Sequence, residues 1–185
     1  NRFDVVIIAD LFQPQTIEML KELPIILVEV SFEVSTKSKA LNKAMTAIGD
    51  NYDVALVLDA DNMMKPDFIE KVNLAFDSGF HVVQGHRIAK NTNTAFAILD
   101  AISEEVNNHI FRKGHRKLGF SSALIGSGMA FDYSFFKETM ANVKAVGGFD
   151  KELELKLLRD KNKIEYLHHA LVLDEKVQKA DVFAT

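Results

Sequence analysis

The chain has 185 residues, of which 48% are hydrophobic and 26% charged, a balance typical of one globular domain with a substantial core. Its 22 basic and 26 acidic residues give a net charge of −4, which argues against a protein that wraps a nucleic-acid backbone. Cysteine is absent, which excludes disulfide scaffolds, cysteine nucleophiles, iron–sulfur clusters and thiolate zinc sites. No apolar run reaches the roughly 18 residues that a membrane-spanning helix needs.

Apolar runs and amphipathic segments alternate along the first half of the chain. Strands are predicted at residues 4–9, 25–30 and 54–58, because continuous apolar runs of this length are typical of strands buried on both faces. Helices are predicted between them at residues 16–23 and 39–48, where apolar residues recur at helical spacing.

The alternation continues in the second half. A helix is predicted to start at Pro66, because proline is favoured in a first helical turn, and a strand follows at 80–83. Residues 95–111 are predicted to form a longer helix with one buried aliphatic face, made of Ile98, Leu99, Ile102, Val106 and Ile110. Residues 112–122, with basic residues, Gly and Ser, are predicted to form a loop. The remaining predicted elements are one helix at 151–158 and short strands at 128–131, 164–167 and 170–173.

This order of elements predicts one α/β domain around a largely parallel sheet. In such sheets ligands bind beyond the carboxyl ends of the strands, where Asp10, Asp59 and Asp61 lie in this sequence. A single Asp in this position is often only a turn former or a helix N-cap. Asp59 and Asp61 are more specific, because two carboxylates on one side of an extended backbone favour a cation between them. Oxygen-only ligands indicate Mg²⁺ or Mn²⁺.

Other nucleotide-binding and catalytic motifs are missing. The sequence has neither GxxxxGK followed by Ser or Thr nor GxGxxG, and neither HExxH nor GxSxG. His168 and His169 suggest a metal pair, but neighbouring residues of a strand point to opposite faces, so at most one of them is expected to reach a site.

Six segments occur in the order seen in family 2 glycosyltransferases of the GT-A fold: VVIIAD, KSKALNKAM, VALVLDADNMMKPDF, VVQGHR, GSGMAF and FDKELELKLL. The chain especially resembles the membrane-linked branch that includes cellulose-synthase-like enzymes and N-acetylglucosaminyltransferases, and the resemblance covers nearly all of its length. It implies a Rossmann-like α/β/α sandwich of the nucleotide-diphospho-sugar transferase type, with a mostly parallel sheet.

The resemblance also implies roles for individual residues. Asp10 matches the acid that holds the nucleobase, and Lys37 matches a basic residue near the nucleotide. Asp59 and Asp61 match the DxD motif, in which the first acid contacts the ribose or sugar and the second ligates the metal. Asp150 matches the catalytic base at a helix start. Residues that match the sugar and acceptor side are Gln84, Arg87, Gly126, Ser127 and Gly128.

Several of these residues have simpler interpretations. Asp150 is a suitable N-cap for the helix that follows it, and a capping Asp can still turn its second oxygen into a cleft. The segment Gly126–Gly128 can be a tight turn, and Lys37 can be a solvated residue before a helix. The sequence also departs from the family, because Phe149 stands beside Asp150 where the family usually has Glu.

The resemblance implies an inverting transfer of a sugar from a nucleotide-diphospho sugar, preferably a UDP-sugar, to a saccharide or lipid-linked acceptor, as in polysaccharide biosynthesis. The family's first strand and its QxxRW motif are missing, so residues 1–185 are expected to be one catalytic domain taken from a longer protein. We expect a cytoplasmic domain, with the parent at the cytoplasmic face of a membrane and attached there only through parts outside this chain.

Three alternatives stay open. The first is a catalytically weak module that binds a nucleotide sugar without turnover. The second is a nucleotidyltransferase, although such enzymes usually open on a glycine-rich basic loop where this chain has Asp10-Leu11-Phe12-Gln13-Pro14. The third is a structural domain, which leaves the acids at the strand ends unexplained.

Overall fold

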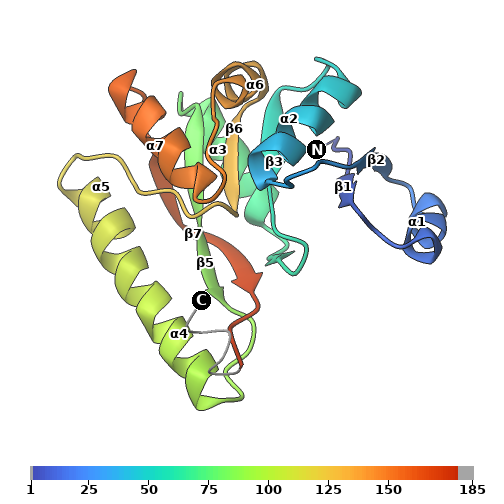
Figure 1. Cartoon of the computed structure of the whole chain (residues 1–185). Coiled ribbons are helices and arrows are strands. Elements are labelled where there is room, and N and C mark those ends of the chain that lie inside the picture. Colours follow the sequence, from blue (N-terminus) through green and yellow to red (C-terminus); the bar gives the residue numbers. More distant parts are fainter. Residues whose placement is uncertain (1, 179–185) are drawn as a thin grey trace. The chain divides into compact units, whose positions relative to one another are not determined.

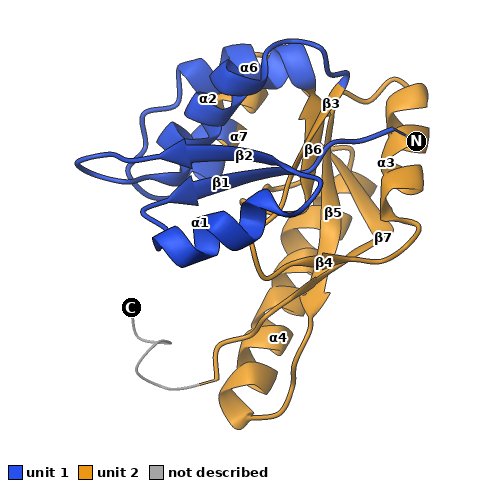
Figure 2. Cartoon of the chain, turned by 90° about the vertical axis from the view of Figure 1, so that its right-hand side faces the viewer, with its two compact units in different colours: residues 1–53, 133–153 blue, residues 54–132, 154–185 orange. Residues whose placement is uncertain are grey.

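The computed structural model describes residues 2–178, which form two compact units (Figure 2). Unit 1 comprises the described residues of 1–53 and 133–153, and unit 2 those of 54–132 and 154–185. Both units combine strands with helices, so the predicted α/β class is confirmed.

Unit 1 is a small parallel sheet covered by helices. Its elements are β1 (Val6–Asp10), α1 (Pro14–Lys21), β2 (Ile26–Val30), α2 (Lys37–Ile48), α6 (Tyr133–Ala141) and the first turn of α7 (Phe149–Arg159). The two strands pair in parallel, and α1 connects them (Figure 1). Val28 and Val30 of β2 pack with Ala44 of α2 in the core of this unit. Because β1 and β2 run in the same direction, Asp10 lies at the carboxyl edge that the sequence predicted for it.

Side-chain caps and cross-links define α2 and its contact with α6. The hydroxyl of Thr36 accepts a hydrogen bond from the backbone N–H of Lys39 over 3.2 Å and so caps the start of α2. At the other end, the Tyr133 hydroxyl of α6 donates to the Gly49 carbonyl over 2.6 Å. The Asn42 amide donates to the Met140 carbonyl over 3.0 Å, which joins the two helices along their length.

Unit 2 contains a five-stranded sheet in the order β3-β6-β5-β7-β4. Its elements are β3 (Val54–Val57), β4 (Met63–Met64), α3 (Phe68–Asp77), β5 (Val82–Ala89), α4 (Ala95–Asn107), the π-helical η1 (Asn108–Gly114), α5 (His115–Lys117), β6 (Met129–Asp132), β7 (Glu165–Asp174) and the rest of α7. Within this sheet only β5 and β7 pair in parallel, so the expectation of a mostly parallel sheet is wrong. The reason is that β6 inserts between β3 and β5 in the opposite direction.

Helix α3 covers the hydrophobic core of this sheet. Phe68 and Val72 of α3 pack against Val83 of β5 and Val172 of β7. A Cβ atom added at Gly85 would come within 2.6 Å of the Phe68 ring, so glycine at this position lets helix and strand pack closely.

The structure differs from the sequence-based elements in several places, of which the following matter most. The helix predicted at 95–111 continues through η1 and α5 to Lys117, so the first half of the loop predicted at 112–122 is helical (Figure 1). The two short strands expected at 164–167 and 170–173 are one strand, β7, with a register shift after Leu167. Elements α6 and β4 were not predicted. Within residues 2–178 no helix combines the length and the apolar character needed to cross a bilayer.

Candidate functional site

The loop after β3 carries the acids Asp59 and Asp61. The chain turns directly after the strand, because the backbone N–H of Asn62 donates to the Asp59 carbonyl over 3.1 Å. The extended backbone expected between the two acids is therefore replaced by a turn. The Asp61 side chain is exposed, and one of its oxygens accepts a 3.1 Å hydrogen bond from the Asn62 amide. Its other oxygen has no hydrogen-bond partner among residues 2–178.

The segment Gly126–Gly128, which precedes β6, supports this turn. Gly126 and Gly128 have φ values of +77° and +63°, in the left-handed region that favours glycine. Between them, the buried Ser127 hydroxyl accepts a 3.2 Å hydrogen bond from the Asp59 backbone N–H and donates to the Asn62 side-chain oxygen. The segment is thus a tight turn, and its serine holds the loop that carries the two acids.

The side chain of Gln84, on β5, also holds this glycine turn. Its side chain is completely buried, its amide donates to the Ser127 carbonyl over 2.9 Å, and its side-chain oxygen accepts from the Ile125 backbone N–H over 3.0 Å. A fully buried side chain cannot touch a sugar in this conformation. In this conformation the Gln84 side chain supports the glycine turn, and its role on the sugar side stays a prediction.

Arg87 of β5 connects the Asp59 loop to a buried charged cluster. Its Nε lies 2.6 Å from a Glu104 carboxylate oxygen of α4, and its Nη1 lies 4.0 Å from Asp59 Oδ2. Lys176 Nζ is 2.8 Å from Asp174 Oδ2 and is also bonded to Glu104. The Asn62 amide donates to Asp174 Oδ1 over 2.8 Å, which closes the cluster back onto the Asp61 loop.

The charges of this cluster are not balanced. Burial opposes the charge of Arg87, but the facing carboxylates of Glu104, Asp174 and Asp59 outweigh it and raise the pKa of Arg87. In formal charges the cluster has an excess of one negative charge, with the carboxylates of Asp59, Asp61, Glu104 and Asp174 against Arg87, Lys176 and the buried Arg112, which faces Glu104. A bound cation would offset this excess.

The described side chains fit a divalent cation that is shared between protein and ligand. Among residues 2–178, no group of three or more His, Asp or Glu side chains gathers as a complete metal site. Mg²⁺ usually takes one or two protein carboxylates and draws its remaining ligands from substrate phosphates and water. Asp61, exposed and with one oxygen to spare, meets this requirement.

Three of the predicted site residues, Asp10, Lys37 and Asp150, belong to unit 1. Asp10 ends β1, and its Oδ1 is buried with no hydrogen-bond partner among the described residues. The next residue, Leu11, has a φ of +56°, which is uncommon for a non-glycine residue and costs energy. A buried unpaired oxygen beside a strained backbone is the pattern expected where a ligand supplies the missing hydrogen bond.

Lys37 and Asp150 lie at the starts of two helices. Lys37 is the first residue of α2, and its Nζ lies 5.5 Å from the centre of the Phe149 ring. Helix α7 starts at Phe149, two residues earlier than predicted, so Asp150 lies in the first turn and not at the N-cap position. The Phe149 ring, where the family usually has Glu, therefore contacts the lysine side chain from the opposite helix start.

Four members of the cluster were not predicted from the sequence: Asn62, Glu104, Asp174 and Lys176. Asp174 could have been found, because it follows an apolar run at a strand end as Asp10 and Asp59 do. Glu104 and Lys176 carried no local signal, because their pairing joins positions 72 residues apart.

A family model described as "Glycosyltransferase like family 2" matches residues 1–184. A search of curated proteins found no match. Among solved structures, the chain is similar to the crystal structure of 4-diphosphocytidyl-2C-methyl-D-erythritol synthase from Anaerococcus prevotii DSM 20548, with a TM-score of 0.58 and 13% identity. The match covers 98% of this chain and 79% of that chain, and at this identity it shows a shared fold alone.

Proposed function

This chain belongs to the glycosyltransferase-like family 2, and we propose that it transfers a sugar from a nucleotide-diphospho sugar to an acceptor hydroxyl with inversion at the anomeric carbon. Family membership makes it a glycosyltransferase that binds a nucleotide-sugar donor and an acceptor. The finer features belong to the proposal: a UDP-sugar donor, a saccharide or lipid-linked acceptor, a divalent metal, and a place in the membrane-linked branch at the cytoplasmic face.

The proposed roles of the donor residues follow the family's motifs, in unit 1 for Asp10 and Lys37 and in unit 2 for Asp59 and Asp61. Asp10 would accept a hydrogen bond from the nucleobase, which is supported by its buried, unpaired Oδ1. Asp59 would contact the ribose or sugar, and Asp61 would hold Mg²⁺ or Mn²⁺ on the diphosphate. When bound, such a cation neutralises the negative charge of the diphosphate leaving group. Lys37 would lie near the nucleotide, and Arg87 would orient Asp59.

Asp150 is proposed as the general base. The acceptor oxygen would attack the anomeric carbon while its proton passes to the Asp150 carboxylate, and the bond to the diphosphate would break with departure of the nucleoside diphosphate. Asp150 lies in the first turn of α7, so its carboxylate stands at the start of that helix.

The observation that carries this proposal is the excess of negative charge around the Asp59–Asp61 turn. Hydrogen bonds of Ser127 and Asn62 hold this turn in place. The test is calorimetric titration of the 185-residue chain with UDP and with GDP, each with and without Mn²⁺. We expect Mn²⁺-dependent binding of one nucleotide. Asp61→Asn should abolish the metal dependence, whereas Asp77→Asn, an exposed acid at the end of α3, should leave it intact.

Absence of metal-dependent binding of either nucleotide would contradict the proposed donor site. Binding of donor without transfer to any acceptor would instead favour the catalytically weak binding module.

Nucleotidyl transfer is the second candidate, because the similar solved structure is of a synthase with a diphosphocytidyl group in its name. The two reactions release different products. A nucleotidyltransferase releases pyrophosphate from a nucleoside triphosphate, and a glycosyltransferase releases a nucleoside diphosphate from a nucleotide sugar. An assay for both products in parallel distinguishes them, and pyrophosphate release would contradict glycosyl transfer.

A further inference from the structure

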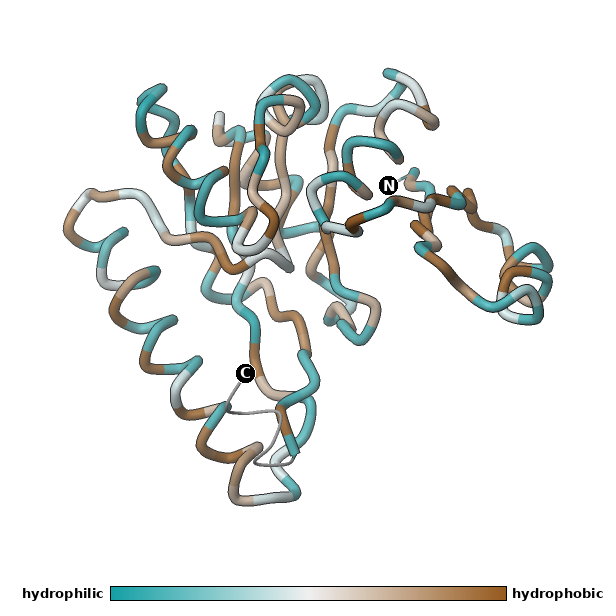
Figure 3. The backbone as a smooth tube through the Cα atoms, viewed as in Figure 1, coloured by the Kyte–Doolittle hydropathy of each residue, from teal (hydrophilic) through white to brown (hydrophobic). Residues whose placement is uncertain are grey.

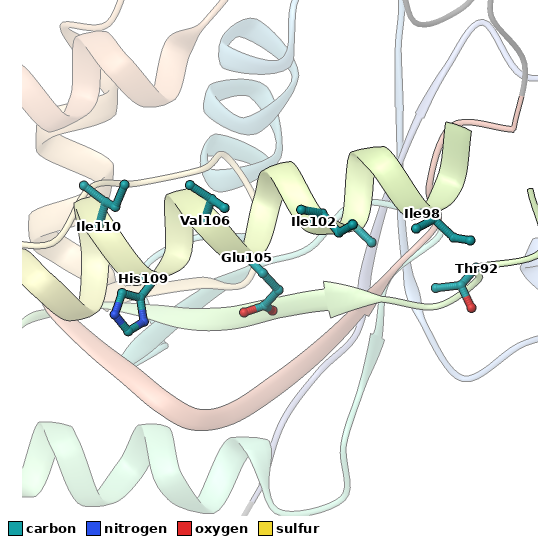
Figure 4. A pocket seen from close by; sticks show the side chains of 8 residues that line it. Thr92, Ile98, Ile102, Glu105, Val106, His109 and Ile110 are labelled. Atoms are coloured by element: carbon teal, nitrogen blue, oxygen red, sulfur yellow. The ribbon is translucent and has the colours of Figure 1, made fainter. Parts of the chain in front are cut away.

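The first observation is an exposed aliphatic row along α4 and η1. The side chains were expected to be buried, yet they are 44–55% exposed and recur every fourth residue: Ile98, Ile102, Val106 and Ile110. Apolar segments recur along the whole of this helix in Figure 3, and Figure 4 shows these side chains along its length. We call these four residues the apolar row. Exposed aliphatic side chains in a continuous row usually mark a contact surface.

A polar row with the same four-residue spacing runs beside it. Its members are Glu105, His109, Lys113 and Lys117. Glu105 is already engaged, because its Oε1 lies 2.8 Å from His86 Nε2 of β5. The row therefore becomes basic toward α5, and the sequence contains no Asp or Glu from Val106 to Phe131.

The basic end of this row borders a cleft of about 510 Å³ between α5 and the start of β7. Lys113, Lys117 and His169 line it, and so does Arg116. Glu165, the one acid in its lining, is paired with Arg116, which donates to its two oxygens over 2.8 and 2.5 Å. Lys113 and Lys117 form no ion pair among the described residues, so this end of the cleft presents positive charge.

The register shift in β7 gives this cleft its histidines. Between Leu167 and Leu171 the strand has extra residues, while its partner β5 passes directly from Gly85 to His86. The rings of His168 and His169 lie 5.0 Å apart as a result, so the expectation that they point to opposite faces is wrong.

Two polar groups of the cleft lining have no protein partner. His168 Nδ1 and the Tyr166 hydroxyl are buried and form no hydrogen bond among the described residues, and Tyr166 as a whole is 7% exposed. Burial lowers the pKa of His168, and the neighbouring His86, Lys113 and His169 lower it further against an opposite effect of Glu105. The side chains of Lys113 and Lys117, which also line the cleft, suit a ligand with anionic oxygens.

We propose that the cleft binds the phosphate group of an anionic phospholipid, whose acyl region contacts the apolar row. A row of exposed aliphatic side chains flanked by lysines is the pattern of helices that lie in the membrane interface. Phe96, Leu99 and Phe111 of the same helical segment are also exposed, so the apolar surface extends beyond the row. The basic residues at its end favour an anionic surface as the partner.

Tyr166 at the cleft pairs with Gln84 of β5, and Asp174 at the charged cluster pairs with Ala89, so the two lie about 17 Å apart along the sheet. Vesicle binding and nucleotide binding are measured separately, so this inference and the proposed function can fail independently.

The experiment is co-sedimentation of the 185-residue chain with vesicles of phosphatidylcholine alone and of phosphatidylcholine mixed with phosphatidylglycerol. We expect binding to the mixed vesicles that weakens with added salt, and little binding to phosphatidylcholine. Lys113→Gln with Lys117→Gln should weaken binding about 30-fold, because each lysine near an anionic surface contributes about 5-fold. Ile102→Gln with Val106→Gln should also weaken it, by removing apolar contact.

The matched control replaces two exposed lysines elsewhere, Lys43→Gln with Lys65→Gln, and should bind like the unmodified chain. UDP titration of every variant checks that the donor site is intact.

Equal vesicle binding by the Lys113/Lys117 variant and the control would overturn the proposal. So would binding of inorganic phosphate in the cleft without any vesicle binding, which indicates a soluble ligand. Self-association that is lost in the Ile102/Val106 variant, again without vesicle binding, would assign the row to a second copy of the chain.

Discussion

The hydroxyl of Ser127 accepts a hydrogen bond from the backbone N–H of Asp59 over 3.2 Å, although the two residues are 68 positions apart. This bond fixes the first acid of the Asp59–Asp61 turn to the glycine turn before β6. The same hydroxyl donates to the Asn62 side chain, so one buried oxygen sets both ends of the turn.

Replacement of Ser127 by alanine should loosen this turn. The Asp59 N–H keeps only its longer 3.3 Å bond to Asn62, and the Asn62 oxygen loses a donor, so we expect a loss of about 1–2 kcal/mol in unfolding free energy. Nucleotide binding in the presence of Mn²⁺ should weaken as well. Urea unfolding and calorimetric titration measure the two effects, with Ser103→Ala on the exposed side of α4 as control. Unchanged binding by Ser127→Ala would show that the turn does not position the acids.

Asp150→Asn should remove the proposed general base. Because the asparagine amide cannot take the proton of the attacking hydroxyl, kcat should fall about 10²- to 10⁴-fold. The affinity for the nucleotide-sugar donor should stay nearly constant. Steady-state kinetics, together with UDP titration, separates these quantities. Asp160→Asn, an exposed acid after the end of the same helix, is the matched control. Turnover that survives in Asp150→Asn would disprove the assignment.

Glu104→Met should be strongly destabilising, because it leaves Lys176, which is 2% exposed, with one carboxylate partner fewer. Breaking a buried ion pair from one side typically costs about 3–5 kcal/mol. Combining Glu104→Met with Lys176→Met should restore part of this loss, since Lys176 is then removed too, while Arg87 still lacks its 2.6 Å partner Glu104. Urea unfolding of the two single variants and the double variant measures the coupling, and strictly additive losses would argue against it.

The Arg116–Glu165 pair should make the protein sensitive to acid. Burial alone would raise the pKa of Glu165, but hydrogen bonds from Arg116 and the Tyr166 backbone outweigh it and hold the pKa below its ordinary value of 4.5. A lowered folded-state pKa stabilises the fold above the unfolded-state pKa, and this stability is lost as the pH falls through the folded-state value. Glu165→Gln should therefore lower stability at neutral pH and flatten its decline below about pH 5. An unchanged decline in thermal unfolding experiments would contradict the prediction.

Local sequence was sufficient for most elements and for the acids at strand ends. The run Val54–Leu58 predicts a strand because it is apolar and short, and the polar Asp59 and Asp61 directly after it predict a loop at the sheet edge. The glycines at 126 and 128 predict a turn, because glycine readily adopts positive φ. These features depend on neighbouring residues only.

Helix α4 shows the limit of periodicity. The spacing of Ile98, Ile102 and Val106 correctly predicted a helix with an apolar side, but it also predicted that this side would be buried. An amphipathic pattern has the same form whether the apolar side meets the core or an external surface. Only the packing of Ala97, Glu104 and Asn108 against the rest of unit 2 decided which side is inside.

The sequence by itself therefore determined the α/β class, the family, and the strand-end position of the predicted acids. The tertiary structure alone decided how β6 inserts against the direction of its neighbours, and how Glu104 and Lys176 meet beneath Arg87. It also decided that a register shift in β7 brings His168 and His169 to one cleft. The reason is physical: strand propensity and turn chemistry act over a few residues, whereas pairing direction, strand register and buried charge depend on contacts between distant parts of the chain.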